Sequence, residues 1–567
     1  MIKLRVISIV KKALLRTIEA LKKDGDEEAL LLLNDLGTID ISLEVPKDDK
    51  HGDFATNLAM LVAKKIKVRP HDIAKNLITQ VLDINKKEEL IEKVEIAGPG
   101  FINFFIFKKV YKDEMFRILT KKEDYGKSDI GSEKKVRIEF VSANPTGPLH
   151  VGHGRGAVIG DVLSSIFTFA GYDVVREYYL NDRGNQMNIL GRTAREWKKA
   201  LGQGEKPAFL TKSSEGESWY KGAYMEDVSQ GIQTNLEEED FHWGLAAADV
   251  ILEKIKNDLA YFGVKPFDAW LSERHLYDSG DVAEVVDTLR KKGLIIKKEG
   301  AEWFLSSEMG DDADRVLKKS NGEWTYLTAD IALHDFKFQT GCDQVIDIWG
   351  ADHHGYIARV KGAVQALGHD PKQMSVILCQ LVRLMRSGEP VPMSTRSGEF
   401  IELRTIIEEV GKDVARFFFL MRKVDAHLDF DLDVAKKQSM DNPVYYIQYA
   451  HARICNIESV FDEEGLTQSS LKDILLEELS CKEEVFLMKK LSRFQEVIEI
   501  CVISQEPYYL TVYLREVAAS FHSFYRKCRV ITSDSEKTQA RFALARATKH
   551  VLKNGLEILG LSAPLKM

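Results

Sequence analysis

The sequence predicts an α/β protein with a mainly parallel sheet in its middle, a small α+β region before it and an all-helical region after it. Three observations support this. Apolar and polar residues alternate from Val136 to Phe140, a helical pattern begins at His153, and a second strand is expected from Asp173 to Leu180. A strand, helix and strand in this order place the two strands parallel. From Val434 onward, apolar residues recur at helical spacing with few turn signals, which predicts a helical bundle.

A turn rich in proline and glycine joins the first strand to the helix. Proline fixes φ and disfavours helix at the preceding residue, so Asn144-Pro145 and Gly147-Pro148 end the strand. The helix N-terminus then presents unpaired N–H groups at the carboxyl ends of the strands, where phosphate binds. His150 and His153, one turn apart, can donate to phosphorus oxygens as charge builds, and Gly152 lets a ligand approach the backbone. The segment therefore predicts a nucleotide site.

Two other interpretations of the histidine pair remain open. A His-x-x-His pair can be half of a metal site, but no Glu follows His150 and no nearby Cys or His has the spacing of a third ligand. The pair can also belong to a packed turn without function.

A further strand is expected at Gln344–Trp349, and it ends in a loop that contains Asp352, His353 and His354. We expect this loop to hold nucleotide, with Asp352 accepting from hydroxyls. A metal is disfavoured because neighbouring side chains on an extended loop point apart.

Length and composition set outer limits. A chain of 567 residues predicts roughly three to five domains. Lys3 and Arg5 interrupt the apolar N-terminal stretch, and no apolar run is long enough for a membrane span, so we expect a cytoplasmic protein without membrane contact. Six cysteines without a Cys-x-x-Cys pair favour reduced, buried thiols over a zinc ribbon.

The formal net charge of −8 is unfavourable for binding phosphate-rich partners, but charge is unevenly distributed. From Ser520 to Met567 the chain has nine Lys or Arg and three acids. Arg541, Lys549 and Lys553 fall on one helical stripe. A nucleic-acid-binding face and a solvated face are both consistent with this stripe.

At this point the sequence resembles a known family. His150-Val151-Gly152-His153 is similar to the HIGH signature of class I aminoacyl-tRNA synthetases. Longer matching segments resemble arginyl-tRNA synthetases in particular and cover nearly the whole chain. They are Glu139–His153, Tyr178–Gln186, Gly350–Tyr356, Asp441–Arg453 and Ser562-Ala563-Pro564.

The resemblance implies three domains. An N-terminal domain, residues 1–120, would contact the elbow of tRNA, with Phe101 and Asn103 at positions that read a D-loop base. A Rossmann-type catalytic domain, residues 121–435, would carry an insertion at about 190–268. A helical anticodon-binding domain, residues 436–567, would use Tyr449 and Met567.

The arginine site can be argued from the substrate. A guanidinium is planar, always charged and offers five donors, so a buried site must supply carboxylates. In the family, residues matching Glu139, Tyr326 and Asp330 hold the guanidinium, and residues matching Ser142 and Asn144 bind the α-amino and carboxylate groups. We assign arginine binding to Glu139, Ser142, Asn144, His150, Tyr326, Asp330 and His353. We assign ATP binding to His150, Gly152, His153, Gly350, Asp352, His354 and Met393. We assign catalysis to His150, His153, Ser394 and Arg396.

The second signature of the class departs from the family pattern. Where many relatives have two lysines, this chain reads Pro392-Met393-Ser394-Thr395-Arg396. Loss of one preorganised charge can lower a rate by about 10² to 10³. Some family members place a compensating lysine just before the first signature, but Gly147 stands there. A catalytically impaired tRNA-binding paralogue is therefore the alternative to an active enzyme, and a small-molecule nucleotidyltransferase is a third possibility.

The predicted function is that of an arginine–tRNA ligase. ATP and arginine would form arginyl-adenylate, and the terminal ribose of tRNA would take the arginyl group. The resemblance implies that tRNA binds before activation proceeds. Mg²⁺ would enter with ATP as part of the substrate, and no protein-bound metal is expected. We expect a monomer without an editing domain.

Overall fold

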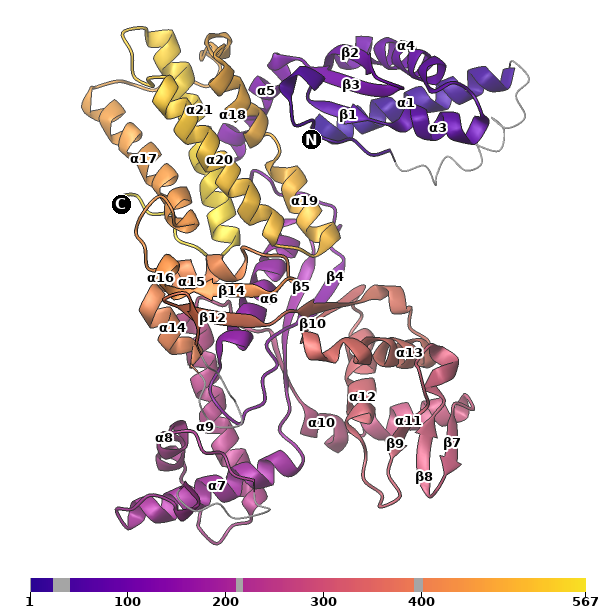
Figure 1. Ribbon diagram of the computed structural model, residues 1–567, viewed down its shortest axis with the longest axis vertical. Helices are drawn as coiled ribbons and strands as arrows, with labels where there is room; N and C mark the ends of the chain where they lie inside the picture. Colours follow the sequence, from indigo (N-terminus) through magenta and orange to yellow (C-terminus); the bar gives the residue numbers. More distant parts are fainter. Residues whose placement is uncertain (1, 24–40, 211–217, 392–400) are drawn as a thin grey trace.

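The structure is a computed structural model and describes residues 2–23, 41–210, 218–391 and 401–567. Its parts spread around a central sheet: the N-terminal domain projects to the upper right in Figure 1, the C-terminal helices stand at the upper left, and two groups of inserted elements extend downward. No helix of the described residues is long and apolar enough to cross a membrane.

The N-terminal domain packs helices against a small antiparallel sheet. Strand β3 (Phe101–Ile106) lies between β1 (Phe54–Thr56) and β2 (Ile91–Ala97). The surrounding helices are α1 (Ile2–Lys23), α3 (Leu58–Ile66), α4 (Pro70–Glu88) and α5 (Lys108–Lys121). An ion pair between Lys489 and Asp53, 2.5 Å from Nζ to Oδ1, joins this domain to the C-terminal helices.

The central sheet has five parallel strands in the order β11-β10-β4-β5-β6. Strand β4 (Lys135–Glu139) leads into α6 (Val151–Phe169), and β5 spans Asp173–Leu180 as predicted. The other strands are β6 (Ala269–Ser272), β10 (Gln344–Gly350) and β11 (Met374–Cys379). The strand order reverses between β4 and β10, and open α/β sheets bind ligands beyond such a point. The predicted α/β class is confirmed.

Two insertions separate consecutive strands of this sheet. Between β5 and β6 the chain forms α7 (Asn185–Gly202), α8 (Tyr224–Gly231) and α9 (Asp240–Tyr261), the helical insertion that the sequence predicts. Between β6 and β10 it forms a second group, seen at the lower right of Figure 1. Its elements are α10 (Glu273–Asp278), α11 (Asp281–Lys291), β7 (Ile295–Lys298), β8 (Ala301–Phe304), β9 (Arg315–Lys318) and α12 (Tyr326–Gln339).

A short 3-10 helix and a second small sheet complete the central region. Strand β12 (Val382–Arg386) pairs with β13 (Glu389–Pro390) and β14 (Leu428–Asp431). The remaining elements are the 3-10 helix η6 (Ala351–Tyr356) and the helices α13 (Ile357–Leu367), α14 (Leu403–Val410), α15 (Lys412–Phe419) and α16 (Leu432–Ala435).

The C-terminal region is the helical bundle that the sequence predicts. It comprises α17 (Pro443–Glu463), α18 (Lys482–Leu491), α19 (Phe494–Ser504), α20 (Tyr508–Lys527) and α21 (Ser535–Ile558). The helical pattern continues across residues 484–500, but the structure breaks it at Ser492 and Arg493 into α18 and α19. The break lets the buried faces of both helices pack against α20.

The basic stripe on α21 is engaged within the protein. Nε of Arg541 lies 2.7 Å from Oε1 of Glu484, Nζ of Lys549 pairs with Glu458, and Lys553 lies 3.6 Å from a carboxylate oxygen of Glu123. These cations therefore join α21 to α18, to α17 and to Glu123. Each cation of the stripe has an acidic partner within the protein.

Candidate active site

A cavity of about 830 Å³ opens at the carboxyl ends of β4 and β10, where the strand order reverses. Many of the residues predicted to form the site line it, and they come from three separate segments of the chain. They are Glu139, Ser142, Asn144, His150, Gly152, His153, Tyr326, Asp330, Gly350, Asp352 and His353.

The turn after β4 is strained at its first two residues. Val141 and Ser142 have φ angles of 70° and 38°, a region that side chains, and β-branched ones above all, rarely occupy. Contacts hold the turn in place: the Ser142 hydroxyl donates to Oε1 of Glu139 at 2.9 Å and accepts from the backbone N–H of Tyr179 at 3.1 Å. Strain of this kind persists where the surroundings enforce it, often beside ligands.

The two histidines cap the start of α6. Nδ1 of His150 accepts from the Gly152 N–H at 3.1 Å, and Nδ1 of His153 accepts from the His150 N–H at 3.3 Å. Because both Nδ1 atoms accept, the proton of each neutral ring is on Nε2. Burial lowers the pKa of both rings, that of His153 to about 3, so both are neutral near pH 7. A Cβ on Gly152 would lie 3.0 Å from the His150 ring, so this glycine also makes room for the cap.

Two carboxyl groups, the buried Glu273 and the partly buried Asp330, line the same part of the cavity. The Tyr356 hydroxyl donates a hydrogen bond to Oδ2 of Asp330, and the Tyr179 side chain hydrogen-bonds to Glu273. Burial raises the pKa of Asp330, and burial together with the charge of Asp330 raises the pKa of Glu273 to about 7. A cation placed between the two carboxyl groups would therefore stabilise their ionised forms.

Glu139, in contrast, already has a cation. Nζ of Lys337, which is fully buried on α12, contacts Oε2 of Glu139 and lies 2.8 Å from Oδ1 of Asp347. Glu139 therefore reaches the cavity as part of an internal ion cluster, and a ligand would share it with Lys337. Glu139 is predicted to be available to arginine, but it is already paired with Lys337, and the sequence offers no signal for this pairing.

The loop after β10 is not extended as expected. It forms η6, in which Nε2 of His353 lies 3.7 Å from Oδ2 of Asp352. The expectation that neighbouring side chains of this loop point apart is therefore wrong for Asp352 and His353, and it does not argue against a metal there. Gly350, Asp352 and His353 line the cavity, whereas His354 is exposed and is not among the lining residues.

Residues Met393, Ser394 and Arg396 lie outside the described residues. The flanks of their segment are described: β13 ends at Pro390, and Glu402 forms a β-bridge with His150, while the Leu403 N–H donates to the Leu149 carbonyl at 2.7 Å. The described chain after this segment thus lies beside the paired histidines. Arg386, a cation near this segment in the sequence, donates from Nη2 to both oxygens of Glu409 at 2.7 and 2.8 Å.

The residues assigned to tRNA lie on the two end domains. Phe101 is 40% exposed at the start of β3, whereas Asn103 is 4% exposed in the middle of the same sheet. On α17 the Tyr449 hydroxyl accepts from Nη2 of Arg453 at 2.6 Å, and Met567 is half exposed at the C-terminus.

The ionisable side chains among the described lining residues of the cavity are mainly acidic. The lining includes four carboxyl groups and no Lys or Arg; the acids are Glu139, Glu273, Asp330 and Asp352. Glu273, Tyr179 and Tyr356 are absent from the predicted site. Glu273 stands at the start of α10, just after β6, where no motif marks it in the sequence.

Comparisons with known proteins agree with this geometry. A family model described as tRNA synthetases class I (R), catalytic domain, matches residues 114–426. Two more, described as Arginyl tRNA synthetase N terminal domain and DALR anticodon binding domain, match residues 8–106 and 447–567.

Similar proteins extend over nearly the whole chain. Arginine–tRNA ligase of Citrifermentans bemidjiense is 48% identical over 93% of this chain and 95% of its own length, and that of Syntrophotalea carbinolica is 44% identical over 97% and 98%. A putative arginyl-tRNA synthetase structure from Campylobacter jejuni is 34% identical, with a TM-score of 0.73 over 82% of this chain and 100% of its own. The Thermus thermophilus arginyl-tRNA synthetase, 20% identical, shares the fold with a TM-score of 0.74 over 96% of this chain and 100% of its own.

The parallel sheet, the histidine cap at its switch point and the catalytic-domain match define a class I aminoacyl-tRNA synthetase. The three family models and the relatives at 42–48% identity then narrow the class, and the chain belongs to the arginyl-tRNA synthetase family.

Proposed function

We propose that this protein activates arginine with ATP and transfers it to the 3′-terminal ribose of tRNA for protein synthesis. The observation that carries the proposal is the cavity at the switch point of the sheet, whose described lining has four carboxyl groups and no Lys or Arg. Such a lining favours a cationic amino acid, because a desolvated guanidinium needs carboxylate acceptors.

The guanidinium would lie between Asp330 and Glu273, with Tyr326 at the mouth of the cavity. Tyr326 is 68% exposed and lies one helical turn before Asp330, so it could close over the ligand. The α-amino and carboxylate groups would face the strained turn at Ser142 and Asn144, with His353 and Glu139 nearby. This orientation brings the arginine carboxylate toward the paired histidines.

ATP would lie across α6 and the end of β10. Gly152 and Gly350 let the nucleotide approach the backbone, and Asp352 could accept from ribose hydroxyls; His354 and Met393 are further ATP contacts that we propose from the family resemblance alone. The arginine carboxylate would attack the α-phosphorus in line as pyrophosphate leaves. Neutral His150 and His153 would donate Nε2–H bonds to the oxygens on which charge builds.

The triphosphate needs positive charge that the described lining does not supply. We propose that Mg²⁺, bound to ATP, supplies part of it, and that Arg396, with Ser394 near it in the sequence, supplies another part. Glu402, which follows them in the chain, forms a β-bridge with His150. The 3′-hydroxyl of tRNA would then attack the activated carbonyl, and AMP would leave.

The outer domains would position tRNA. We propose that residues 1–120 contact the elbow of tRNA through the exposed Phe101, that residues 436–567 contact the anticodon near Tyr449 and Met567, and that residues 121–435 form the catalytic domain. The side-chain amide of Asn103 is buried, so residues next to Asn103 in the chain would contact tRNA more readily than this amide. We also propose that the protein acts as a monomer in the cytoplasm.

Pyrophosphate exchange tests the proposal. Exchange should require arginine, ATP and cognate tRNA together, and it should be lost in the Asp330→Asn variant. Absence of exchange in a preparation that still binds tRNA would contradict the ligase function and would support an impaired tRNA-binding paralogue.

A further inference from the structure

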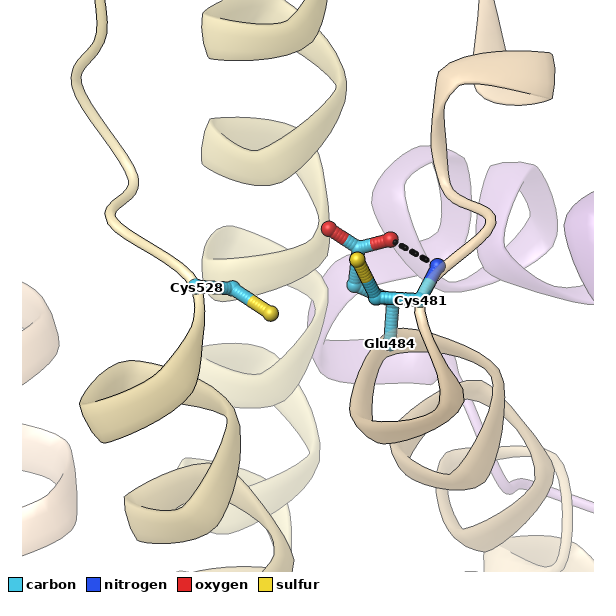
Figure 2. Close-up of side chains that lie close together, drawn as sticks. All are labelled: Cys481, Glu484 and Cys528. Carbon is cyan, nitrogen blue, oxygen red and sulfur yellow. Dashed lines mark hydrogen bonds between the residues drawn. The ribbon is translucent and has the colours of Figure 1, made fainter.

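Two cysteines meet in the C-terminal bundle, far from the cavity. Cys481 directly precedes α18, and Cys528 ends α20. Their sulfur atoms and a carboxylate oxygen of Glu484 all lie within 4.8 Å of one another, and Figure 2 shows both sulfurs pointing into the same space. The fold thus places two thiols together that are distant in the sequence.

Arg541 on α21 balances the charge of this cluster. Its Nε lies 2.7 Å from Oε1 of Glu484, its Nη2 lies 3.9 Å from Sγ of Cys481, and its Nη1 donates to the carbonyl of Arg529 at 2.8 Å. The second Glu484 oxygen accepts from the Cys481 N–H at 2.8 Å. With both thiols protonated, one carboxylate and one guanidinium leave the cluster neutral.

These contacts favour thiol chemistry over a metal ion. A metal would compete with Arg541 and the Cys481 N–H for the Glu484 oxygens, and it would stand next to a guanidinium that has no room to withdraw, since Arg541 is 7% exposed. Formation of a disulfide removes two neutral S–H groups and leaves the Glu484–Arg541 pair intact.

The two thiols differ in access. Cys481 is partly exposed, whereas Cys528 is 3% exposed, and burial raises the pKa of Cys528 to about 12. An accessible thiol next to a buried one is the arrangement in which the first attacks an external disulfide and the second resolves the mixed disulfide. The Sγ of Cys481 also faces the N-terminus of a ten-residue helix and an arginine, both of which stabilise negative charge on sulfur as it reacts.

We propose that Cys481 and Cys528 form a thiol–disulfide exchange site that accepts a small-molecule disulfide. The Cys481 sulfur, after losing its proton to solvent, attacks one sulfur of R–S–S–R, which forms a mixed disulfide and releases one thiolate. The Cys528 sulfur, also after losing its proton, attacks Sγ of Cys481, which forms the internal disulfide and releases the second thiolate. Two protein thiols are oxidised and one external disulfide is reduced to two thiols.

The internal bond would fix the start of α18 to the end of α20. Helix α18 also carries Lys489, which pairs with Asp53 of the N-terminal domain. A disulfide between residues this far apart restricts the unfolded chain, so oxidation should raise the melting temperature by several degrees.

The test uses the full-length protein and oxidised glutathione without oxygen. After alkylation under denaturing conditions, two of the six cysteines should resist labelling, and peptide mass mapping should show a Cys481–Cys528 link. Cys528→Ser should stop at one glutathionyl group on Cys481, and Cys481→Ser should leave Cys528 unmodified. Cys501→Ser, which removes a buried cysteine outside the cluster, should still form the link.

Three results would overturn the proposal. All six thiols could stay reactive after exposure to oxidised glutathione, or the link could form between other cysteines. The purified protein could also carry one equivalent of zinc that is lost in both Cys481→Ser and Cys528→Ser, which would make the cluster a metal site. A further control, Glu484→Gln, keeps both thiols and should retain the exchange.

Discussion

Two groups of carboxylates lie in the same α/β domain and differ in what balances their charge. Glu139, Glu177 and Asp347 surround Lys337, whose ammonium group is fully buried, and Arg137 also pairs with Glu177. Asp330 and Glu273 form no ion pair with a Lys or Arg of the described chain, and tyrosine hydroxyls are their close partners. We call these the compensated cluster and the uncompensated pair.

The difference indicates that the compensated cluster stabilises the fold, whereas the uncompensated pair binds a ligand. In the compensated cluster burial raises the pKa of Glu139, but neighbouring Lys337 opposes this effect and lowers the pKa of Asp347, while the surrounding acids raise the pKa of Lys337. In the uncompensated pair burial is the main effect, and it raises both pKa values. A fold does not gain stability from such a pair, so its presence beside a cavity indicates that a ligand supplies the cation.

The largest effect is expected when the uncompensated pair loses a charge. Asp330→Asn keeps the shape and removes the main acceptor for a buried guanidinium, so kcat/KM for arginine should fall by roughly 10³-fold. Steady-state pyrophosphate exchange measures it, and the KM for ATP should not change. An unaltered kcat/KM for arginine would remove Asp330 from the site.

The compensated cluster should respond in stability instead. Lys337→Met leaves three buried acids without their shared cation, so the free energy of unfolding should fall by about 3 kcal/mol or more, measured by denaturant unfolding. Adding Asp347→Asn removes one of those acids and should restore part of the loss. If Lys337→Met left stability intact and raised only the KM for arginine, the division between the two groups would be wrong.

A smaller effect is expected from the tyrosine that orients Asp330. Tyr356→Phe removes the hydroxyl that donates to Oδ2 of Asp330, and a hydrogen bond to a charged group contributes about 1.5 to 3 kcal/mol. The KM for arginine should rise about tenfold. Tyr261→Phe, a tyrosine of the same domain that stacks on Arg404 and does not line the cavity, serves as the matched control and should leave that KM unchanged.

The smallest effect concerns pH. Because the pKa of Glu273 is raised to about 7, this carboxyl is ionised above pH 7 and protonated below it. Protonation removes one negative charge from the pair, so the KM for arginine should rise as pH falls from 8 to 6, by up to roughly tenfold. Glu273→Gln should flatten this dependence, and an unchanged profile in that variant would assign the titration to another group.

Much of the fold follows from local patterns. The bounds of β5, the helical bundle and the turn between β4 and α6 are predictable because alternation, proline and glycine act over a few residues. The break between α18 and α19 is not, since Ser492 and Arg493 fit a helix and only packing against α20 separates the two. Likewise, the residues after β10 fold as η6 where a loop is expected.

The site is predictable only where a motif marks it. His150, Gly152 and Asp330 belong to recognisable segments and line the cavity. Glu273 lies in no motif and reaches the cavity because β6 adds to the sheet beside β5. The pairing of Lys337 with Glu139 is equally invisible, because the two residues are far apart in sequence and meet only in the fold.

The most direct test of the uncompensated pair changes the substrate and leaves the protein unaltered. Citrulline has nearly the shape of arginine but no positive charge. In tRNA-dependent pyrophosphate exchange at pH 8, kcat/KM for arginine should exceed that for citrulline by about 10⁴-fold or more. Comparable values for the two amino acids would contradict the account, because the acids would then not be there to bind a cation.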